Sequence, residues 1–207
     1  MPEKRRNELI HWVESSSDRF IIEDDYDGEF NFSHISLAPL YKKNRDKIIY
    51  IGSFSRSLSP ALRISYMVLP DSLIEIYEDR FKGYDCPCST LQQKALTIFI
   101  DKGYFQRHLN RMRNLYNKKH KMMKEILYTI ENIEIHYANA GMSFVIEIKN
   151  YSKDMEDRFT DTGIKITSLN KFKKENDMGN YFIMDFSKLT ENEIKEGLDL
   201  LDNIINN

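Results

Sequence analysis

The chain has 207 residues, of which 41% are hydrophobic and 30% charged, and its formal net charge is -2. This length and apolar content allow one large domain or two small ones with a real core. The near-neutral charge excludes a global field that would attract nucleic acid or a membrane surface, and the longest apolar runs are far too short to span a bilayer. The N-terminus lacks the apolar stretch of a signal peptide, so we expect a cytoplasmic protein.

The first hundred residues alternate helices with short apolar strands. Apolar residues at helical spacing predict a helix over residues 4–16, and the runs at 20–22, 48–51 and 64–69 predict buried strands. Pro70 stops the third strand, and Asp71 is the expected N-cap of a helix that ends at residue 81. Another helix is expected over residues 91–101. This alternation indicates an α/β unit with a mostly parallel sheet.

The second half of the chain shows a different succession of predicted helices and strands. A long helix is predicted over residues 104–130, with an apolar stripe along one side. Short strands follow at 133–137, 144–148, 164–167 and 181–186, and helices are expected near 153–162 and 191–205. This pattern indicates a small α+β unit. We therefore expect a boundary near Gly103, with one domain over residues 1–103 and a second over 104–207.

Other features have ordinary explanations. Cys86 and Cys88 form a C-x-C motif without the further ligands of a zinc site, so we interpret them as reduced thiols and predict no metal site. His108 is interpreted as a surface or packing residue. The cationic residues between 107 and 124 could suggest nucleic-acid binding, but the apolar positions at helical spacing among them favour a solvated helix face.

Residues 51–66 are the most informative segment, and they directly follow the second predicted strand. They read Ile-Gly-Ser-Phe-Ser-Arg-Ser-Leu-Ser-Pro-Ala-Leu-Arg-Ile-Ser-Tyr. This segment resembles the one that carries the Schiff-base lysine in fold-type I pyridoxal-phosphate (PLP) enzymes. Ser53, Ser55 and Arg63 match that pattern, but Arg56 stands where the lysine is expected. Because a guanidinium stays charged up to a pKa above about 12 and is a poor nucleophile, ordinary transamination is not expected.

The segment Ile-Ile-Glu-Asp-Asp-Tyr-Asp-Gly-Glu-Phe at residues 21–30 strengthens the resemblance. Together the two segments look like the aminotransferase-like domain of MocR-type regulators, the GntR subfamily that fuses a winged-helix DNA-binding domain to a PLP-binding domain. The resemblance extends over nearly the whole chain. It implies the C-terminal part of a fold-type I PLP-dependent domain: the end of the large α/β domain followed by the complete small α+β domain. Further matching segments are residues 89–93, 103–105, 108–113, 140–142, 186–190 and 196–197.

The resemblance also implies roles for individual residues, and both polar segments follow strands at the end of a sheet where ligands gather. Some relatives carry an arginine near the last strand that binds a substrate carboxylate. Residues 180–182 offer none here, and the nearest cations are Lys171, Lys173 and Lys174. The implied cofactor site consists of Asp24 at the pyridine nitrogen of PLP, Tyr26 at its ring oxygen, Ser53, Ser55 and Arg63 at its phosphate, and Arg56 at the lysine position.

Three hypotheses for function remain open. The chain could be the PLP- and effector-binding module of a MocR-type regulator, which senses an amino acid or amine and is not catalytically active. It could be an aminotransferase whose lysine was replaced, or a cofactor-free dimerisation scaffold. In each case we expect a homodimer, because this fold usually builds its sites at a dimer interface. The chain itself should contact neither membrane nor nucleic acid, since DNA binding would belong to the winged helix.

Overall fold

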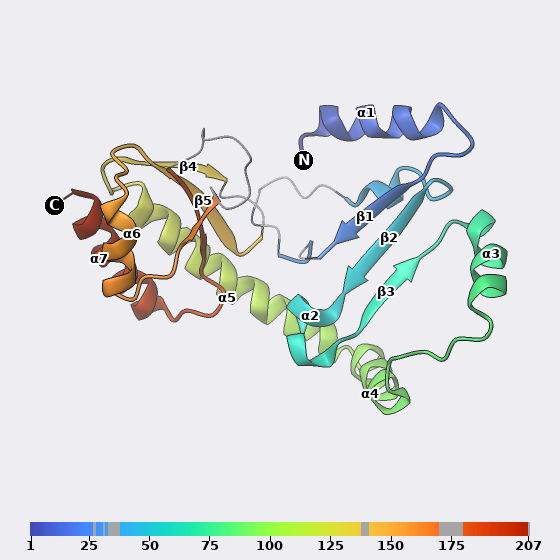
Figure 1. Cartoon of the computed structure of the whole chain (residues 1–207). Coiled ribbons are helices and arrows are strands. Elements are labelled where there is room, and N and C mark those ends of the chain that lie inside the picture. The colour runs from blue at the N-terminus through green and yellow to red at the C-terminus, as the bar shows by residue number, and fades with distance from the viewer. Residues whose placement is uncertain (27, 31, 33–37, 138–140, 170–179, 207) are drawn as a thin grey trace. The chain divides into compact units, whose positions relative to one another are not determined.

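The computed structural model describes residues 1–26, 28–30, 32, 38–137, 141–169 and 180–206 (Figure 1). Two compact units form, Met1–Glu29 with Ile35–Leu109 and Phe30–His34 with Asn110–Asn207. Within the described residues, no helix is both long and apolar enough to cross a bilayer. The helices of the first unit are α1 (Glu3–Glu14), the 3-10 turn η1 (Leu40–Lys42), α2 (Phe54–Ser57), the 3-10 turn η2 (Pro60–Leu62), α3 (Asp71–Phe81), α4 (Thr90–Asp101) and the start of α5 (Tyr104–Leu127).

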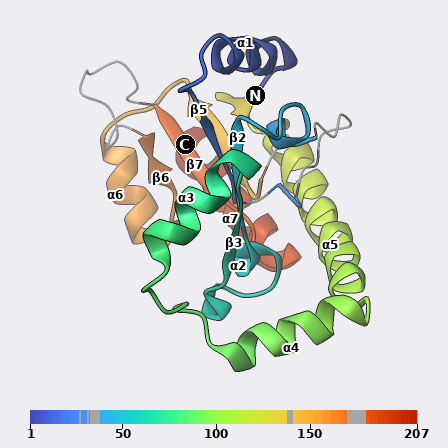
Figure 2. The same ribbon diagram turned by 90° about the vertical axis from the view of Figure 1, so that its right-hand side faces the viewer.

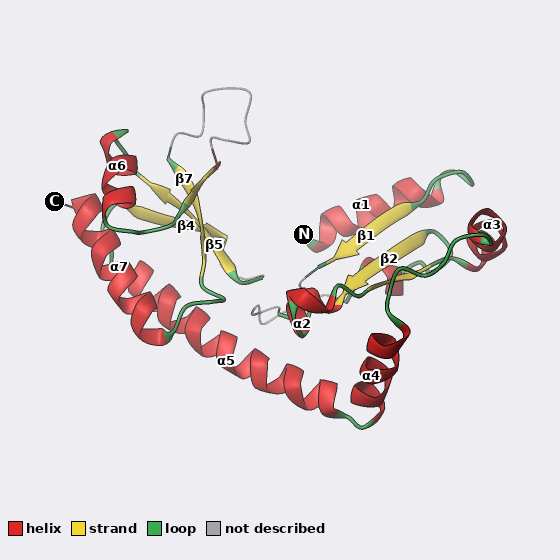
Figure 3. Cartoon of the chain, turned by 60° about the horizontal axis from the view of Figure 1, so that its bottom comes forward, coloured by secondary structure: helices red, strands yellow, loops and turns green. Residues whose placement is uncertain are grey.

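The first unit is built on a three-stranded sheet with the order β1 (Ile21–Asp25), β2 (Ile48–Ser53) and β3 (Ser65–Val68). β1 runs parallel to β2, and β3 runs antiparallel to β2. α1 lies beside this sheet (Figure 3). Val13 of α1, Leu40 of η1 and Ile48 of β2 are buried and contribute to the core of this unit.

The sheet of the first unit is mixed, because β3 is antiparallel to β2 whereas β1 is parallel to it. Only residues 54–64 join β2 to β3, whereas a parallel crossover needs a dozen or more residues. The chain turns back instead, and the Phe54 N–H donates to the Ile64 carbonyl at 3.0 Å. Gly52 of β2 is aligned with Tyr66 of β3, and a Cβ at Gly52 would lie 2.3 Å from the Tyr66 ring. A side chain at position 52 would therefore have to displace the Tyr66 ring.

The second unit is a four-stranded antiparallel sheet with the order β4 (Ile133–Tyr137), β5 (Ser143–Ile148), β7 (Tyr181–Asp185) and β6 (Thr167–Ser168). Every second residue of β5 and β7 is buried. α5 and α7 (Glu191–Asn206) lie against one face of the sheet, and α6 (Asp154–Asp161) packs beside α7 (Figures 1 and 3). The fully or almost fully buried core includes Leu127, Phe144, Ile146, Ile148, Phe182, Phe186, Leu198 and Leu201.

Most predicted elements are present within a few residues of their expected bounds, with three corrections. β6 covers Thr167–Ser168 rather than residues 164–167. Pro70 occupies the N-cap position of α3, and Asp71 is its first helical residue. The cationic face of α5 is not solvated throughout, because Lys119 is buried and its Nζ donates to the Ser187 carbonyl at 3.4 Å.

Candidate functional site

Three consecutive acids end β1, and two of them are bound within the fold. The Glu23 carboxylate accepts a hydrogen bond from the backbone N–H of Leu40 at 2.7 Å, which fixes η1 to the sheet. The Asp25 carboxylate accepts from the Tyr50 hydroxyl at 2.7 Å. Burial, and then this bond to Asp25, hold the pKa of Tyr50 well above its ordinary value. Both acids therefore have structural partners on one face of the sheet.

Asp24 lies on the opposite face. It is aligned with Ile51, and Ser53 stands two residues further along β2, so the two polar side chains share a face. Asp24 is exposed, and no described residue makes a hydrogen bond or ion pair with its carboxylate. An unpartnered carboxylate at the carboxyl end of a parallel strand is available to a ligand.

The turn after β2 is held by its own serines. The Ser53 hydroxyl oxygen accepts from the Ser55 N–H at 3.1 Å, and the Ser59 hydroxyl oxygen accepts from the Ala61 N–H at 3.2 Å. These bonds use oxygen lone pairs, so the hydroxyl hydrogen of Ser53 remains available as a donor. Ser57 is buried, and its hydroxyl finds no hydrogen-bond partner among the described residues. Of these groups, the partly exposed Ser53 hydroxyl is the one available to a polar ligand.

Arg63 ends this turn in a conformation that is uncommon for its residue type. Its backbone has φ 50° and ψ 34°, in the left-handed region that favours glycine. Such a conformation costs of order 1 kcal/mol and persists only where the surroundings impose it, often at ligand sites. The Arg63 side chain is exposed and has no partner among the described residues. The serine turn therefore ends at an exposed cation that has no partner among the described residues.

Arg56 is positioned beside Tyr26. Its guanidinium carbon lies 5.4 Å from the centroid of the Tyr26 ring, within the range of a cation–π interaction. This contact joins the loop after β1 to the turn after β2. Asp24, Tyr26, Ser53 and Arg56 thus come from two adjacent strand ends. The structure places Ser55 and Arg63 in the same turn, Ser55 buried and Arg63 exposed.

His108 was not predicted to belong to this region. Its Nε2 lies 2.9 Å from the Ser57 carbonyl oxygen, so the first turns of α5 are hydrogen-bonded to the segment that carries Arg56. No signal in the sequence identifies this pair, because the two residues are far apart in the chain and His108 lies among arginines. Lys171, Lys173 and Lys174, the cations expected nearest to a substrate carboxylate, lie outside the described residues.

One further group of polar side chains lies in the second unit. The ligand atoms of Glu134, His136 and Glu147 are all within 4.8 Å of one another, a spacing that a metal ion could bridge. However, the Lys149 ammonium lies 2.7 Å from Glu134 and 3.0 Å from Glu147. Because that ammonium already forms ion pairs with both carboxylates, we interpret the group as an ion-pair network of the sheet.

The fold and the two segments at the strand ends define the class of protein to which this chain belongs. Residues 26–201 match the family described as "Aminotransferase class I and II", and the chain belongs to this family. Among solved structures, the kynurenine aminotransferase of Pyrococcus horikoshii, solved with PMP, superposes on 100% of this chain and 52% of its own, with a TM-score of 0.84 and 26% identity. The expected fold-type I class is therefore confirmed.

The similar curated proteins show which group of this family the chain resembles most specifically. The chain is 34% identical over 204 residues to YdeL of Bacillus subtilis, an uncharacterized HTH-type transcriptional regulator, with 95% of this chain and 43% of YdeL covered. It is 32% identical over 143 residues to a probable rhizopine catabolism regulatory protein, MocR of Rhizobium meliloti, covering 68% of this chain and 28% of MocR. The resemblance to MocR-type regulators is confirmed. The chain spans less than half the length of these relatives.

Proposed function

We propose that this chain is the PLP- and effector-binding module of a MocR-type transcriptional regulator, and that Arg56 makes it catalytically inactive. The observation that carries the proposal is the different use of the three acids of β1. Glu23 and Asp25 are bound within the fold, whereas Asp24 is left unpartnered among the described residues, on the face that it shares with Ser53.

The residues present fit the chemistry of PLP. Asp24 would accept a hydrogen bond from the protonated pyridine nitrogen, and Tyr26 would donate to the ring oxygen. Ser53 and Ser55 offer hydroxyl groups, and the exposed Arg63 offers a two-pronged cation that suits a phosphate. When bound in this way, the pyridine ring of PLP serves as an electron sink.

Arg56 decides what the site can do. A guanidinium is delocalised and a poor nucleophile, so Arg56 would not attack the aldehyde of PLP as a lysine amine does. It still contributes a positive charge beside Tyr26. The chain would therefore bind PLP reversibly and would not transfer amino groups. The effector belongs to the amino acids and amines, whose amino group can react with the free aldehyde.

The remaining properties follow from the regulator assignment. Residues 1–103 would be the end of the large domain, and residues 104–207 the small one. The protein would act in the cytoplasm as a homodimer, to which α1 and the strands at Ile21 and Ile49 contribute. DNA would be contacted only through a winged-helix domain, as the HTH-type names of the relatives suggest.

Calorimetric titration with pyridoxamine phosphate tests the proposal, because this form of the cofactor has no aldehyde and does not react with surface lysines. The chain should bind it, and Asp24→Asn should weaken binding by about tenfold or more, since a hydrogen bond to a charged group is worth about 1.5–3 kcal/mol. Asp199→Asn, at an exposed position of α7, is the control and should bind normally. Absence of binding by the unmodified chain would instead support the cofactor-free scaffold.

A further inference from the structure

α2 is too short to hold its own conformation. It is a single turn, Phe54–Ser57, which carries Ser55 and Arg56 and has Ser53 as its N-cap. Helices shorter than about 12–15 residues are marginal on their own, so contacts with other elements have to keep this turn in place. The positions of Ser53, Ser55 and Arg56 therefore depend on those contacts.

The sheet of the first unit fixes the N-terminal end of α2. The Phe54 N–H donates to the Ile64 carbonyl at 3.0 Å, just before β3. The centroid of the Phe54 ring lies 5.4 Å from that of Tyr66 in β3. Both contacts act on the first residue of the turn, so its last residue has to be held by another element.

α2 ends in a buried carbonyl group. Ser57, its last residue, is only 1% exposed. The last carbonyls of a helix have no partner within the helix, and a buried carbonyl without a hydrogen bond is costly. The Ser57 carbonyl therefore needs a donor from elsewhere in the fold.

His108 of α5 supplies that donor. Its Nε2 lies 2.9 Å from the Ser57 carbonyl oxygen. Because a carbonyl oxygen can only accept, Nε2 carries the hydrogen and donates it. A histidine can cap the C-terminal end of its own helix in this way, and here it caps a different one.

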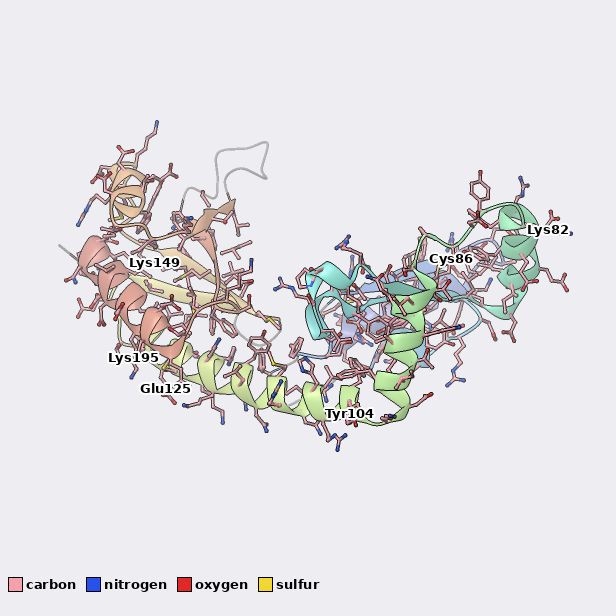
Figure 4. The ribbon with its side chains drawn as sticks, turned by 90° about the horizontal axis from the view of Figure 1, so that it is seen from below. Lys82, Cys86, Tyr104, Glu125, Lys149 and Lys195 are labelled. Carbon is pink, nitrogen blue, oxygen red and sulfur yellow. The ribbon has the colours of Figure 1, made fainter. Side chains whose placement is uncertain are left out.

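α5 also contacts α2 at a second point. It begins at Tyr104 (Figure 4), after the turn at Gly103 that follows α4 (Figure 2). Phe105 lies three residues before His108, so the two side chains share one side of the helix. The Phe105 ring meets the Phe54 ring edge-on, with 5.6 Å between their centroids. All these contacts lie within the first unit.

We propose that His108 is a positioning residue for the cofactor site and acts through α2 without touching the ligand. By bonding the Ser57 carbonyl, it holds the C-terminal end of the turn, so that Ser55 and Arg56 keep their places. The inference rests on the proposed function, since it concerns the same site. It requires an N–H donor at the place of Nε2, and neither the ring nor its volume can replace that donor.

Three substitutions at position 108 separate the donor from the ring. His108→Phe keeps a ring without a donor, His108→Gln places an amide N–H at nearly the reach of Nε2, and His108→Asn is one methylene group too short. His108→Phe and His108→Asn should weaken binding of pyridoxamine phosphate about tenfold, because a buried acceptor is left unpaired. His108→Gln should restore binding to within about threefold of the unmodified chain. His11→Phe, at an exposed position of α1, is the control.

Hydrogen exchange examines the turn without any ligand. The backbone N–H groups of Leu58 and Ser59 donate to the Phe54 carbonyl at 2.9 and 3.3 Å. They should exchange about tenfold faster in His108→Phe, and about as slowly as in the unmodified chain in His108→Gln. Exchange over β1 should stay unchanged in both variants, because the cap acts on α2.

Three results would overturn the inference. His108→Phe could bind pyridoxamine phosphate as tightly as the unmodified chain, or His108→Gln could bind as weakly as His108→Phe. His108→Phe could also speed exchange over β1, which would show a general loss of stability. Failure of the unmodified chain to bind would instead contradict the proposed function, and exchange at Leu58 would then decide alone whether His108 holds α2.

Discussion

Glu23, Asp24 and Asp25 occupy adjacent positions of β1 and face alternate sides of the sheet. The alternation separates two carboxylates with partners in the fold from one that has none among the described residues. A single strand can thus carry both structural and ligand-binding acids, provided that they differ by one position. The proposal that Asp24 binds the cofactor depends on this difference between the three carboxylates.

Replacement of each acid by alanine should separate the two roles. Asp25→Ala should lower the free energy of unfolding by about 1–2 kcal/mol, because it leaves the half-buried Tyr50 hydroxyl without its acceptor. Asp24→Ala should change it by no more than about 0.5 kcal/mol, as for other surface positions. Thermal unfolding of the two variants measures this difference. Equal losses would mean that Asp24 has a structural role.

Arg63 carries the second prediction at this scale. Arg63→Gly should stabilise the chain by about 0.5–1 kcal/mol, because glycine adopts φ 50° without strain. The greater freedom of glycine in the unfolded chain opposes part of this gain. The same change should weaken binding of pyridoxamine phosphate by removing a cation from the phosphate. Denaturant unfolding measures the gain in stability, and calorimetry measures the loss of binding. Unchanged binding would show that Arg63 does not belong to the site.

At the scale of elements, the outer face of the second sheet is tied together by charge. Glu147 of β5 accepts from Lys149, from His136 of β4, and from Asn180 just before β7. The hydrogen bond from Lys149, followed by that from His136, lowers the pKa of Glu147 to about 2. The same network raises the pKa of Lys149 to about 12.

The sign of the pH effect follows from the direction of the Glu147 shift. A carboxyl group whose pKa is depressed in the folded state contributes stability above its ordinary pKa of about 4.5, and loses it as the pH falls toward about 2. Glu147→Gln should therefore destabilise the chain at neutral pH, and the difference from the unmodified chain should shrink between these values. Denaturant unfolding at a series of pH values measures it. A difference independent of pH would mean that the network is not electrostatic.

Elements of more than one or two turns were predictable from the sequence. Hydrophobic periodicity indicates the type of each element, and proline and glycine mark where it begins or ends. α3 covers residues 71–81 as expected, directly after Pro70. The short elements α2, η1 and η2 were not predicted, because an element of three or four residues is too short to show hydrophobic periodicity. The direction of β3 was not predicted, because an apolar run gives no sign of the direction in which a strand pairs.

The candidate site was predictable only in part. The motif located the residues from 24 to 63, but it gave no reason to prefer Asp24 over Asp25 beyond resemblance. That reason comes from Tyr50, which binds Asp25 from a neighbouring strand. The bond between His108 and Ser57 likewise joins residues far apart in sequence. Long-range partners of this kind require the structure.

At the scale of the whole molecule, many large apolar side chains of the described residues are exposed to solvent. We therefore expect association of the isolated chain, as exposed strand edges and apolar helices favour it. Light scattering at micromolar concentration should show a dimer or larger species. A stable monomer with a cooperative thermal transition would contradict this expectation and show that these residues form a self-sufficient core.

We propose that the chain binds PLP without a covalent bond because residue 56 is arginine. Borohydride reduction in the presence of PLP, followed by peptide mass spectrometry, tests it directly and separates position 56 from surface lysines. The unmodified chain should carry no adduct at position 56, whereas Arg56→Lys should carry one that Asp24→Asn diminishes. A reduced adduct on Arg56 itself, or an Arg56→Lys variant that is never labelled at position 56, would contradict the account.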